Sequence, residues 1–471
     1  MTRVVIIGGG IAGLAAAYKL TQTTPPLSLT LIESDNRLGG KIVTERVDGF
    51  VIEGGPDTFL AYKPRGVGLC RELGLENHLH GTNQIIRRTY VMRNSQLHEL
   101  PEGLTGLIPS RFAPMAKTNL ISPLGKLRMG LDYFIPPRAV NGDESLASFV
   151  ERRLGSELYD RLIEPLMSGI YAGDGEQLSL AATFPQLRQT EIEHGGLIKG
   201  MLAAKKKTPT PNAQARSAFL TPTTGLAEIV EALQEKLRGV DIRLSTKVTR
   251  VETASTGYTV RLANGESIES EIVIFATPSF VTADLVEGID PEMSKALNEI
   301  PYASTATVSV AYPLADIPRP LDGYGYIIPR AEGRSILACT WTSTKFPHRA
   351  PEGFGLIRAF IGRAGEDETL DETDEALLNI VRDELKRTLG ITAPPILHRV
   401  FRWHKAMPQY TLGHLDRLAV IEKRLAAHAG LFVAGNAYRG IGLPDCIASG
   451  ERAADSALKF LSISTPLSIK I

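Results

Sequence analysis

The chain has 471 residues, and its 52 basic and 52 acidic side chains cancel to a formal net charge of zero. That balance excludes the basic excess with which proteins hold a nucleic-acid backbone, so we expect no nucleic-acid partner. Hydrophobic residues make up 43% and charged residues 22%, which excludes a multi-span membrane protein. Three widely spaced cysteines, Cys70, Cys339 and Cys446, indicate neither a zinc site nor a disulfide framework.

The N-terminal segment predicts a strand, a glycine turn, a helix and a second strand. Val4 to Ile7 is a β-branched run that suits a strand buried on both faces of a parallel sheet. Helix-forming residues run from Ile11 to Leu20, and a second apolar run follows at Leu29 to Ile32. The apolar stretch Val4 to Tyr18 predicts no targeting or membrane-spanning segment, because glycines interrupt it and it is shorter than the roughly 20 residues that a spanning helix needs.

Residues 60 to 220 are mostly helical in pattern, with Pro- and Gly-rich joints between the predicted helices. The expected helices are Pro64 to Leu73, Pro123 to Phe134, Glu144 to Leu154 and Ser156 to Leu166. The polar, proline-containing stretch Ala203 to Ser217 predicts a surface loop rather than a functional basic patch. These features indicate a helical region inserted into the fold.

Regular patterning returns from 224 to 278. We expect an amphipathic helix at Leu226 to Leu237, a strand at Asp241 to Val251 and a buried strand at Ile272 to Pro278. A hairpin lies between the two strands. Its Asn264-Gly265 pair suits a type I′ turn, in which both central residues need positive φ.

The remainder is strand-rich from 303 to 404, apart from an amphipathic helix around Asp374 to Leu389. A strand at Leu431 to Ala434, a glycine-rich turn at Gly435 to Gly442 and a helix from about Asp445 to Leu461 follow. Strand, glycine turn and helix thus occur near both ends of the chain. The sequence therefore predicts an α/β fold in which one Rossmann-like sheet is built from distant segments.

The first glycine turn carries the chemistry that is easiest to interpret. Gly8-Gly9-Gly10-Ile11-Ala12-Gly13 matches GxGxxG, in which glycines let backbone amides reach a pyrophosphate and let the helix pack on the strand. Glu33 lies 20 residues beyond Gly13, at the end of the second strand, where a carboxylate can bind ribose hydroxyls. The alternative is a plain glycine-rich turn with Glu33 as a surface acid, and the strand and helix around the turn argue against it.

The continuation from Glu33 to Lys41 (ESDNRLGGK) adds a second glycine pair that can approach the same dinucleotide. This extension resembles the flavin oxidoreductases of the amine oxidase and carotene desaturase superfamily, which implies FAD rather than NAD. In that superfamily a loop placed like Glu53 to Thr58 meets the flavin ring, and a segment placed like Phe432 to Cys446 closes the flavin site. No cysteine or histidine occupies a recognisable linkage motif, so we expect noncovalent FAD.

Three longer motifs narrow the resemblance. They are Ile163 to Asp174 (IEPLMSGIYAGD), Thr183 to Gln186 (TFPQ) and Met407 to His414 (MPQYTLGH). Together they resemble the porphyrinogen oxidases, specifically the soluble bacterial type that acts on coproporphyrinogen III or protoporphyrinogen IX, and the similarity runs essentially end to end.

The resemblance implies three regions. A Rossmann-like FAD-binding domain combines residues 1–84, 221–298 and 405–471, a helical insertion takes up 85–220, and a mixed-sheet substrate-binding domain takes up 299–404. By motif, the implied flavin contacts are Gly8, Gly9, Gly10, Ile11, Ala12, Gly13, Glu33, Ser34, Arg37, Gly40, Lys41, Gly55, Pro56, Asp57, Thr58, Val248, Trp403, Ile441, Gly442 and Leu443.

A second set of residues is implied for the substrate. Arg87 would face a propionate, and a flat apolar macrocycle would be lined by Gly169, Tyr324, Ile327 and Phe360. Each residue also has a plain interpretation. Arg87 can be a solvated surface arginine like its neighbour Arg88, and the other four can belong to the ordinary core.

The implied activity is that of an FAD-dependent oxidase that takes six electrons from a porphyrinogen in three hydride-type transfers. O2 regenerates the flavin and gives H2O2, and the reaction belongs to haem biosynthesis. Coproporphyrinogen III is favoured over protoporphyrinogen IX. No acid–base pair stands out, so we nominate no catalytic residue, and His404, beside Trp403, is interpreted as structural.

Two rival functions are another oxidase of the superfamily, acting on amines or carotenoids, and a non-catalytic flavin-binding carrier. The IEPLMSGIYAGD block argues against the first rival, and the intact glycine fingerprint argues against the second. We expect a cytoplasmic protein without a metal, whose partners are its substrate and O2. The sequence leaves open a weak peripheral membrane contact and a transient contact with the next haem-pathway enzyme.

Overall fold

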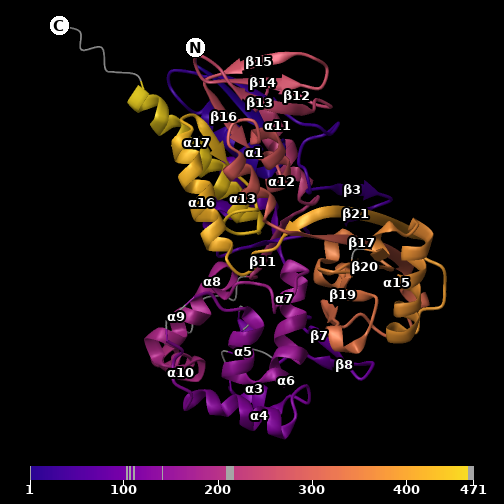
Figure 1. The fold of residues 1–471 in the computed structure, drawn as a ribbon. Coiled ribbons are helices and arrows are strands. Elements are labelled where there is room, and N and C mark those ends of the chain that lie inside the picture. The colour runs from indigo at the N-terminus through magenta and orange to yellow at the C-terminus, as the bar shows by residue number, and fades with distance from the viewer. Residues whose placement is uncertain are drawn as a thin grey trace.

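The computed structural model describes residues 2–101, 104–105, 108–109, 112–139, 142–207, 217–366 and 368–464. Its helices and strands form three parts, seen in Figure 1 as a mixed indigo, pink and yellow part at the top, an orange part at the right and a magenta helical part at the bottom. We call them the parallel-sheet part, the mixed-sheet part and the helical part.

A parallel five-stranded sheet organises the first part, with strand order β12-β2-β1-β16-β22. The strands are β1 (Arg3–Ile7), β2 (Ser28–Ile32), β12 (Asp241–Arg243), β16 (Ile272–Phe275) and β22 (Leu431–Val433). Segments from near both ends and from the middle of the sequence thus pair side by side, which confirms the discontinuous Rossmann-like fold class.

The two faces of this sheet pack against different layers. Val4 and Ile6 of β1 face a helical layer, whereas Val5 and Ile7 face the opposite layer, as the alternation of side chains along a strand requires. The first layer consists of α1 (Ile11–Thr21), α2 (Pro64–Glu72), α11 (Ala227–Lys236) and α17 (Leu443–Ser464). The second consists of β13 (Val248–Thr253), β14 (Tyr258–Leu262), β15 (Ser267–Ser270), α12 (Ser279–Val286), α13 (Pro291–Asn298) and α16 (His414–Ala427).

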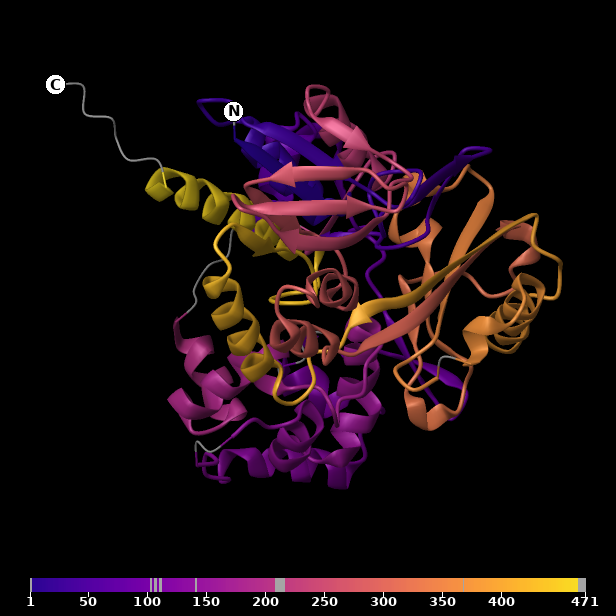
Figure 2. The ribbon, with the colours of Figure 1, turned by 45° about the horizontal axis from the view of Figure 1, so that its top comes forward.

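Figure 2 shows β13, β14 and β15 as an antiparallel sheet lying across the parallel strands. The expected single strand Asp241 to Val251 is in fact two strands, β12 and β13, which belong to different sheets. The chain turns between them at Ser245, whose φ is +49°. The expected type I′ turn is also wrong: only Gly265 has positive φ, at +88°. The Asn264 side chain accepts the amide of Glu266 at 3.0 Å instead, which suits a three-residue loop closed by glycine.

The mixed-sheet part is a seven-stranded sheet of order β21-β17-β20-β19-β18-β7-β8. Its strands are β7 (Tyr90–Arg93), β8 (Gln96–Glu99), β17 (Tyr302–Pro313), β18 (Gly325–Ile327), β19 (Ile336–Trp341), β20 (Phe354–Ile361) and β21 (Leu397–Pro408). One face packs against α15 (Asp374–Leu389). Two strands, β7 and β8, come from the segment expected to be helical; β7 pairs in parallel with β18 because its Tyr-Val-Met run is apolar enough to be buried.

The helical part contains most of the expected helices. Its elements are α3 (Phe112–Lys117), α4 (Pro123–Gly130), α5 (Leu146–Leu154), α6 (Ser156–Leu158), α7 (Glu164–Tyr171), α8 (Leu180–Thr183), α9 (Pro185–His194) and α10 (Leu197–Lys207). The helix expected at Ser156 to Leu166 is interrupted by a π-helical turn at Tyr159–Ile163. Pro165 explains the interruption, because proline supplies no N–H to an α-helical ladder. Of the expected loop Ala203 to Ser217, residues 203–207 belong to α10, and 208–216 lie outside the described residues.

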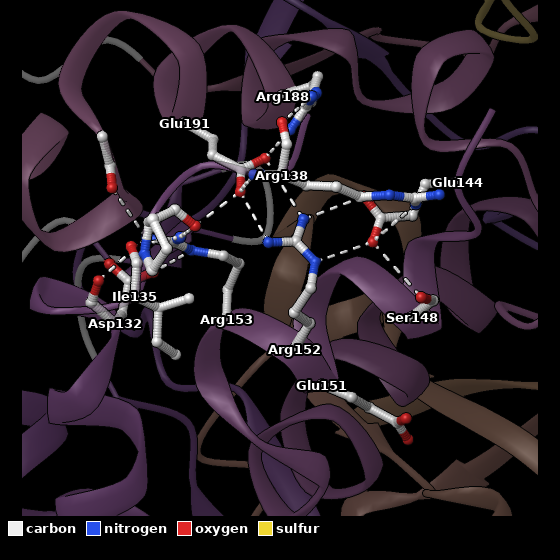
Figure 3. Close-up of polar contacts among 12 residues, drawn as sticks. Asp132, Ile135, Arg138, Glu144, Ser148, Glu151, Arg152, Arg153, Arg188 and Glu191 are labelled. Carbon is white, nitrogen blue, oxygen red and sulfur yellow. Dashed lines mark hydrogen bonds and ion pairs between the residues drawn. The ribbon is translucent and has the colours of Figure 1, made fainter. Parts of the chain in front are cut away.

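Buried charges hold this part together, as Figure 3 shows. Arg153 and Asp132 are both fully buried and form an ion pair. Arg152 bridges Glu144 and Glu191, with nitrogen–oxygen distances of 3.0 and 2.7 Å. Arg153 also donates to the backbone carbonyls of residues 132, 135 and 195.

Short strands connect these parts. β3 (Thr44–Val47) pairs with β4 (Phe50–Glu53), and β11 (Phe219–Pro222) lies between β5 (Phe59–Leu60) and β6 (Leu79–Gly81). No helix within the described ranges is long and apolar enough to span a membrane.

Candidate active site

The glycine turn at the carboxyl end of β1 is tight at two positions and open at a third. A Cβ added at Gly13 would lie 1.9 Å from the Gly8 carbonyl oxygen, so α1 can pack there only without a side chain. Gly8 itself has a φ of +108°. A Cβ at Gly10 would meet nothing within 4 Å. The turn therefore leaves room for a ligand to approach its backbone.

Glu33 stands beside this turn, at the end of β2. Its Oε2 accepts the Gly9 amide at 2.7 Å, and its Oε1 accepts the Asp35 amide at 2.8 Å and the Ser34 hydroxyl at 3.1 Å. The carboxylate is thus held at the mouth of the turn, where parallel α/β sheets bind dinucleotides. Val248 starts β13 close by, since the Thr246 amide donates to the Glu33 carbonyl at 2.9 Å.

The second glycine pair packs directly on the first turn. The Gly39 amide donates to the Gly9 carbonyl at 2.9 Å, and a Cβ at Gly40 would lie 3.2 Å from the Gly10 Cα. Arg37 donates to the Gly40 carbonyl at 2.6 Å and to the Ile42 carbonyl at 3.2 Å. Arg37 therefore holds the shape of this segment.

The loop formed by residues 54–58 lies against the second segment. A Cβ at Gly55 would come within 1.8 Å of the Lys41 carbonyl oxygen and 3.7 Å of the Trp403 ring. Within the described chain, the amides of Gly55, Asp57 and Thr58 donate to no protein acceptor. Three amide donors therefore remain available to a ligand.

The start of α17 closes the same site. The Asp445 carboxylate accepts the Gly442 amide at 3.2 Å and pairs with Lys63, beside Leu443. Burial lowers the pKa of Lys41, and burial raises the pKa of the nearby Cys446 thiol to about 12. Cys446 is therefore a neutral thiol at physiological pH. Its Sγ lies 3.9 Å from the Ile441 carbonyl oxygen.

Two of the substrate candidates, Phe360 and Ile327, lie on strands of the mixed sheet. Ile357, Ala359 and Ile361 of β20 pack toward α15, so Phe360 points to the opposite face, which we call the inner face. Ile327 packs against the core of the helical part. Gly169 is exposed on α7, and a Cβ there would meet nothing within 4 Å.

The other two candidates are at the edge of this face. Tyr324 donates its hydroxyl to Thr82 at 3.0 Å, which ties down the loop that carries Arg87. Arg87 is exposed and donates only to the Gln84 carbonyl, at 2.7 Å. Arg88, in contrast, pairs with Asp322 at 3.1 Å. Of the two neighbours, Arg87 is the one whose guanidinium has no carboxylate partner among the described residues.

A buried charge cluster behind the 54–58 loop was missed by sequence analysis. Arg349 pairs with Glu53 at 3.0 Å, and Lys345 pairs with Asp57 at 3.1 Å. Burial alone would raise the pKa of Asp57, but Lys345, Arg358 and Arg349 hold it well below its usual range. The signal was an arginine inside the apolar run Leu356-Ile357-Arg358-Ala359-Phe360.

Two further observations limit the chemistry. His404 is exposed on β21, and across the described ranges no group of three or more His, Cys, Asp or Glu side chains could hold a metal ion. The glycine turns, the Glu33 carboxylate and the unpaired loop amides suit a dinucleotide with a redox ring. These features define a nucleotide-dependent oxidoreductase of α/β fold.

Known proteins agree with this geometry. The family described as "Flavin containing amine oxidoreductase" matches residues 11–458. The coproporphyrinogen III oxidase of Bacillus subtilis is 40% identical, with 97% of this chain and 98% of that protein covered. The Staphylococcus aureus protein of the same name is 37% identical, with 97% and 98% covered. A solved Exiguobacterium structure, provisionally named a protoporphyrinogen oxidase, is 34% identical with a TM-score of 0.85 and covers 98% of this chain and 99% of its own.

The chain belongs to the flavin-containing amine oxidoreductase family. Its cofactor is FAD, and the residues present fit that group, because an open glycine turn, a carboxylate and unpaired amides meet at one edge of the sheet.

Proposed function

We propose that the protein oxidises a porphyrinogen, with coproporphyrinogen III favoured. The observation that supports the proposal is that two substrate candidates, Phe360 and Ile327, lie on the face of the mixed sheet opposite α15. Side chains of the same sheet bind the Gly54 carbonyl, next to the loop implied for the flavin. Similarity to two coproporphyrinogen III oxidases over nearly the whole chain supports it. The balanced reaction removes six electrons and six protons from the substrate and converts three O2 to three H2O2.

The residues of this chain bind and orient the reactants. Bound FAD supplies two-electron oxidation and reoxidation by O2. The amides of residues 11–13, at the N-terminus of α1, and the Glu33 carboxylate would hold the pyrophosphate and ribose. Phe360, Ile327 and Gly169 would form an apolar wall for the macrocycle. Arg87 would bind a propionate, because its guanidinium can bind a carboxylate bidentately.

No side chain of the inner face is assigned as a general base. The Asp57 carboxylate is engaged by Lys345, and the Cys446 thiol stays protonated because burial raises its pKa. Protons from the pyrrole nitrogens would therefore pass to water or to the substrate. The neutral thiol also supports noncovalent FAD, so acid precipitation should release the yellow chromophore into the supernatant; flavin in the pellet would contradict this.

A rate comparison tests the substrate. Purified protein should convert coproporphyrinogen III to the porphyrin, followed by fluorescence, with a higher kcat/KM than protoporphyrinogen IX. The reverse order would favour protoporphyrinogen IX, which the Exiguobacterium name supports. If the protein oxidised neither porphyrinogen, an oxidase that acts on amines or carotenoids would become the favoured function.

We place the reaction in haem biosynthesis and in the cytoplasm. The oxidised ring of the product is flat and photoreactive, so a transient contact with the next enzyme of that pathway would limit its release. Fractionation of cells and a pull-down with that enzyme would test the two placements.

A further inference from the structure

Arg358 lies behind the 54–58 loop, in the middle of strand β20. Its side chain is only 3% exposed. Its Nη2 donates to the Gly55 carbonyl and lies 3.3 Å from the Gly54 carbonyl oxygen, while its buried Nε has no partner within the described chain. A buried guanidinium with an unpaired nitrogen is costly, so its retention calls for a role other than stability.

Three neighbouring strands converge on one carbonyl. The Gly54 oxygen accepts the Thr307 hydroxyl of β17 at 3.0 Å and the Trp403 indole N–H of β21 at 2.8 Å, besides Arg358 of β20. A carbonyl oxygen has two lone pairs, so this site is saturated. The mixed sheet thus fixes the peptide unit that joins Gly54 to Gly55.

The orientation of that peptide determines where an amide points. In a planar trans peptide the C=O and the following N–H point in opposite directions. Because the Gly54 carbonyl faces the mixed sheet, the Gly55 N–H faces away from it. This amide has no protein acceptor among the described residues. A rigid, outward-facing donor is what a redox ring with carbonyl and nitrogen acceptors requires.

Arg358 also touches the substrate side. Its guanidinium lies 4.8 Å from the centroid of the Phe360 ring, two residues along the same strand face. One side chain therefore contacts both a flavin-facing loop and a substrate-wall residue. Only this second contact rests on the proposed function.

We propose that Arg358 is a positioning residue. It fixes the Gly54–Gly55 peptide so that the Gly55 N–H is presented to the flavin ring, and it places a positive charge directly behind that donor. Both effects favour added negative charge on the ring, so Arg358 raises the reduction potential of bound FAD.

A buried arginine can also matter for stability alone, and Arg363 provides the matched control. Arg363 is 3% exposed and follows the end of the same strand. It donates to the Ile328 carbonyl at 2.7 Å and pairs with Glu164 at 3.6 Å. It contacts neither the loop nor Phe360, so its loss reports only the cost of removing a buried arginine.

The experiment compares Arg358→Met, Arg358→Lys, Thr307→Val and Arg363→Met as purified holoproteins. The readouts are the FAD dissociation constant, the midpoint potential and absorption spectrum of bound FAD, and the melting temperature. Arg358→Met should weaken FAD binding roughly tenfold to a hundredfold and lower the potential, because charged hydrogen bonds to the loop are lost. Arg358→Lys should restore most of the potential, and Thr307→Val should shift it less, in the same direction as Arg358→Met.

Arg363→Met should lower the melting temperature and leave the FAD affinity and potential unchanged. The proposal is overturned if Arg358→Met leaves the potential unchanged, or if Arg363→Met shifts it equally. Should Arg358→Met fail to fold, an unchanged potential in Thr307→Val would overturn it. None of these readouts uses a porphyrinogen, so failure of the proposed substrate is a separate result.

Discussion

Two regions of this protein contain buried arginines, and the hydrogen bonding of the arginine side chains differs between them. In the helical part, every side-chain nitrogen of Arg153 donates to a carboxylate or a backbone carbonyl, and the cluster joins helices to one another (Figure 3). Behind the 54–58 loop, the Nε atoms of both Arg349 and Arg358 lack a partner among the described residues. There, Arg358 donates only to backbone carbonyls of the 54–58 loop.

The difference separates two uses of buried charge. In the helical part, the hydrogen bonds of Arg153 compensate for the desolvation of its charge and join the helices. Behind the 54–58 loop, part of the desolvation cost of Arg358 is not compensated, and its hydrogen bonds fix the backbone of the loop. The helical cluster should therefore be sensitive mainly in stability, and the loop cluster mainly in cofactor properties. Two predictions test this contrast directly, and two more test the residues implied for the cofactor and the substrate.

The largest expected effect is on stability. Arg153→Met should destabilise the protein by about 3–5 kcal/mol, because it leaves the fully buried Asp132 carboxylate without its ion-pair partner. Denaturant titration followed by circular dichroism measures the loss, and the absorption of bound FAD in the folded fraction should be normal. A loss below about 1 kcal/mol, or an altered flavin spectrum, would remove the contrast between the two clusters.

The second prediction concerns the affinity for FAD and is tested at Glu33. Glu33→Ala should weaken FAD binding by about 1.5–3 kcal/mol, the size of a hydrogen bond that involves a charged group. Titration of the apoprotein with FAD measures it. Asp35→Ala is the control, since that neighbouring carboxylate is exposed, accepts the Asn36 amide and lies 3.8 Å from the Arg37 guanidinium, without a bond to the glycine turn. Equal affinities for the two variants would show that Glu33 only shapes the glycine turn.

Arg87 and Arg88 contrast a free guanidinium with a paired one. Arg87→Ala should raise the KM for a propionate-bearing porphyrinogen roughly tenfold to a hundredfold, with a normal flavin spectrum. Arg88→Ala should change KM little, because Arg88 already pairs with Asp322. Steady-state kinetics of both variants decide the matter. A larger effect from Arg88→Ala would mean that Arg88 leaves Asp322 and binds the propionate in place of Arg87.

The smallest effect is a change in pH dependence. Burial raises the pKa of Glu53 above 4.5, whereas hydrogen bonds from Arg152 and Arg188 outweigh burial and lower the pKa of Glu191. The contribution of Glu53 to stability therefore grows as pH falls from neutrality toward 4.5, and that of Glu191 is lost as pH falls below 4.5.

Unfolding free energies measured by denaturant titration from pH 7 to pH 3 test these signs. Glu53→Gln should make the free energy of unfolding less dependent on pH above pH 4.5, and Glu191→Gln should do so below pH 4.5. Each slope should change by at most about 1.4 kcal/mol per pH unit. If both variants changed the same pH range, the two clusters would not differ electrostatically.

Sequence patterns predicted the parts of the fold that local chemistry determines. The strands β1 and β16 could be predicted because a strand buried on both faces has to be apolar along its whole length. The glycine turn could be predicted from its spacing. The break between β12 and β13 was missed, since no glycine or proline marks Ser245. The strands β7 and β8 were missed because β7 joins the sheet through β18, which lies far away in sequence, and β8 pairs only with β7.

The site divides in the same way. Glu33 and the glycines follow from spacing within one segment, and the structure brings the remaining cofactor segments to them. Thr307 and Arg358 were not predicted, because each acts on Gly54 from a strand far away in sequence. Nothing near either residue signals that partner, apart from the charge of Arg358 in an apolar strand.

The order of synthesis gives the discontinuous sheet a further consequence. The glycine turn leaves the ribosome before β22 and α17, which lie more than 400 residues further along the chain. Helix α17 crosses α1 so closely that a Cβ at Gly450 would lie 2.0 Å from the Ala12 carbonyl oxygen. The nucleotide-binding sheet is therefore incomplete until residues 431–464 have emerged, and tight capture of FAD has to follow that step. Contacts between segments so distant in sequence form more slowly than contacts within one continuous segment.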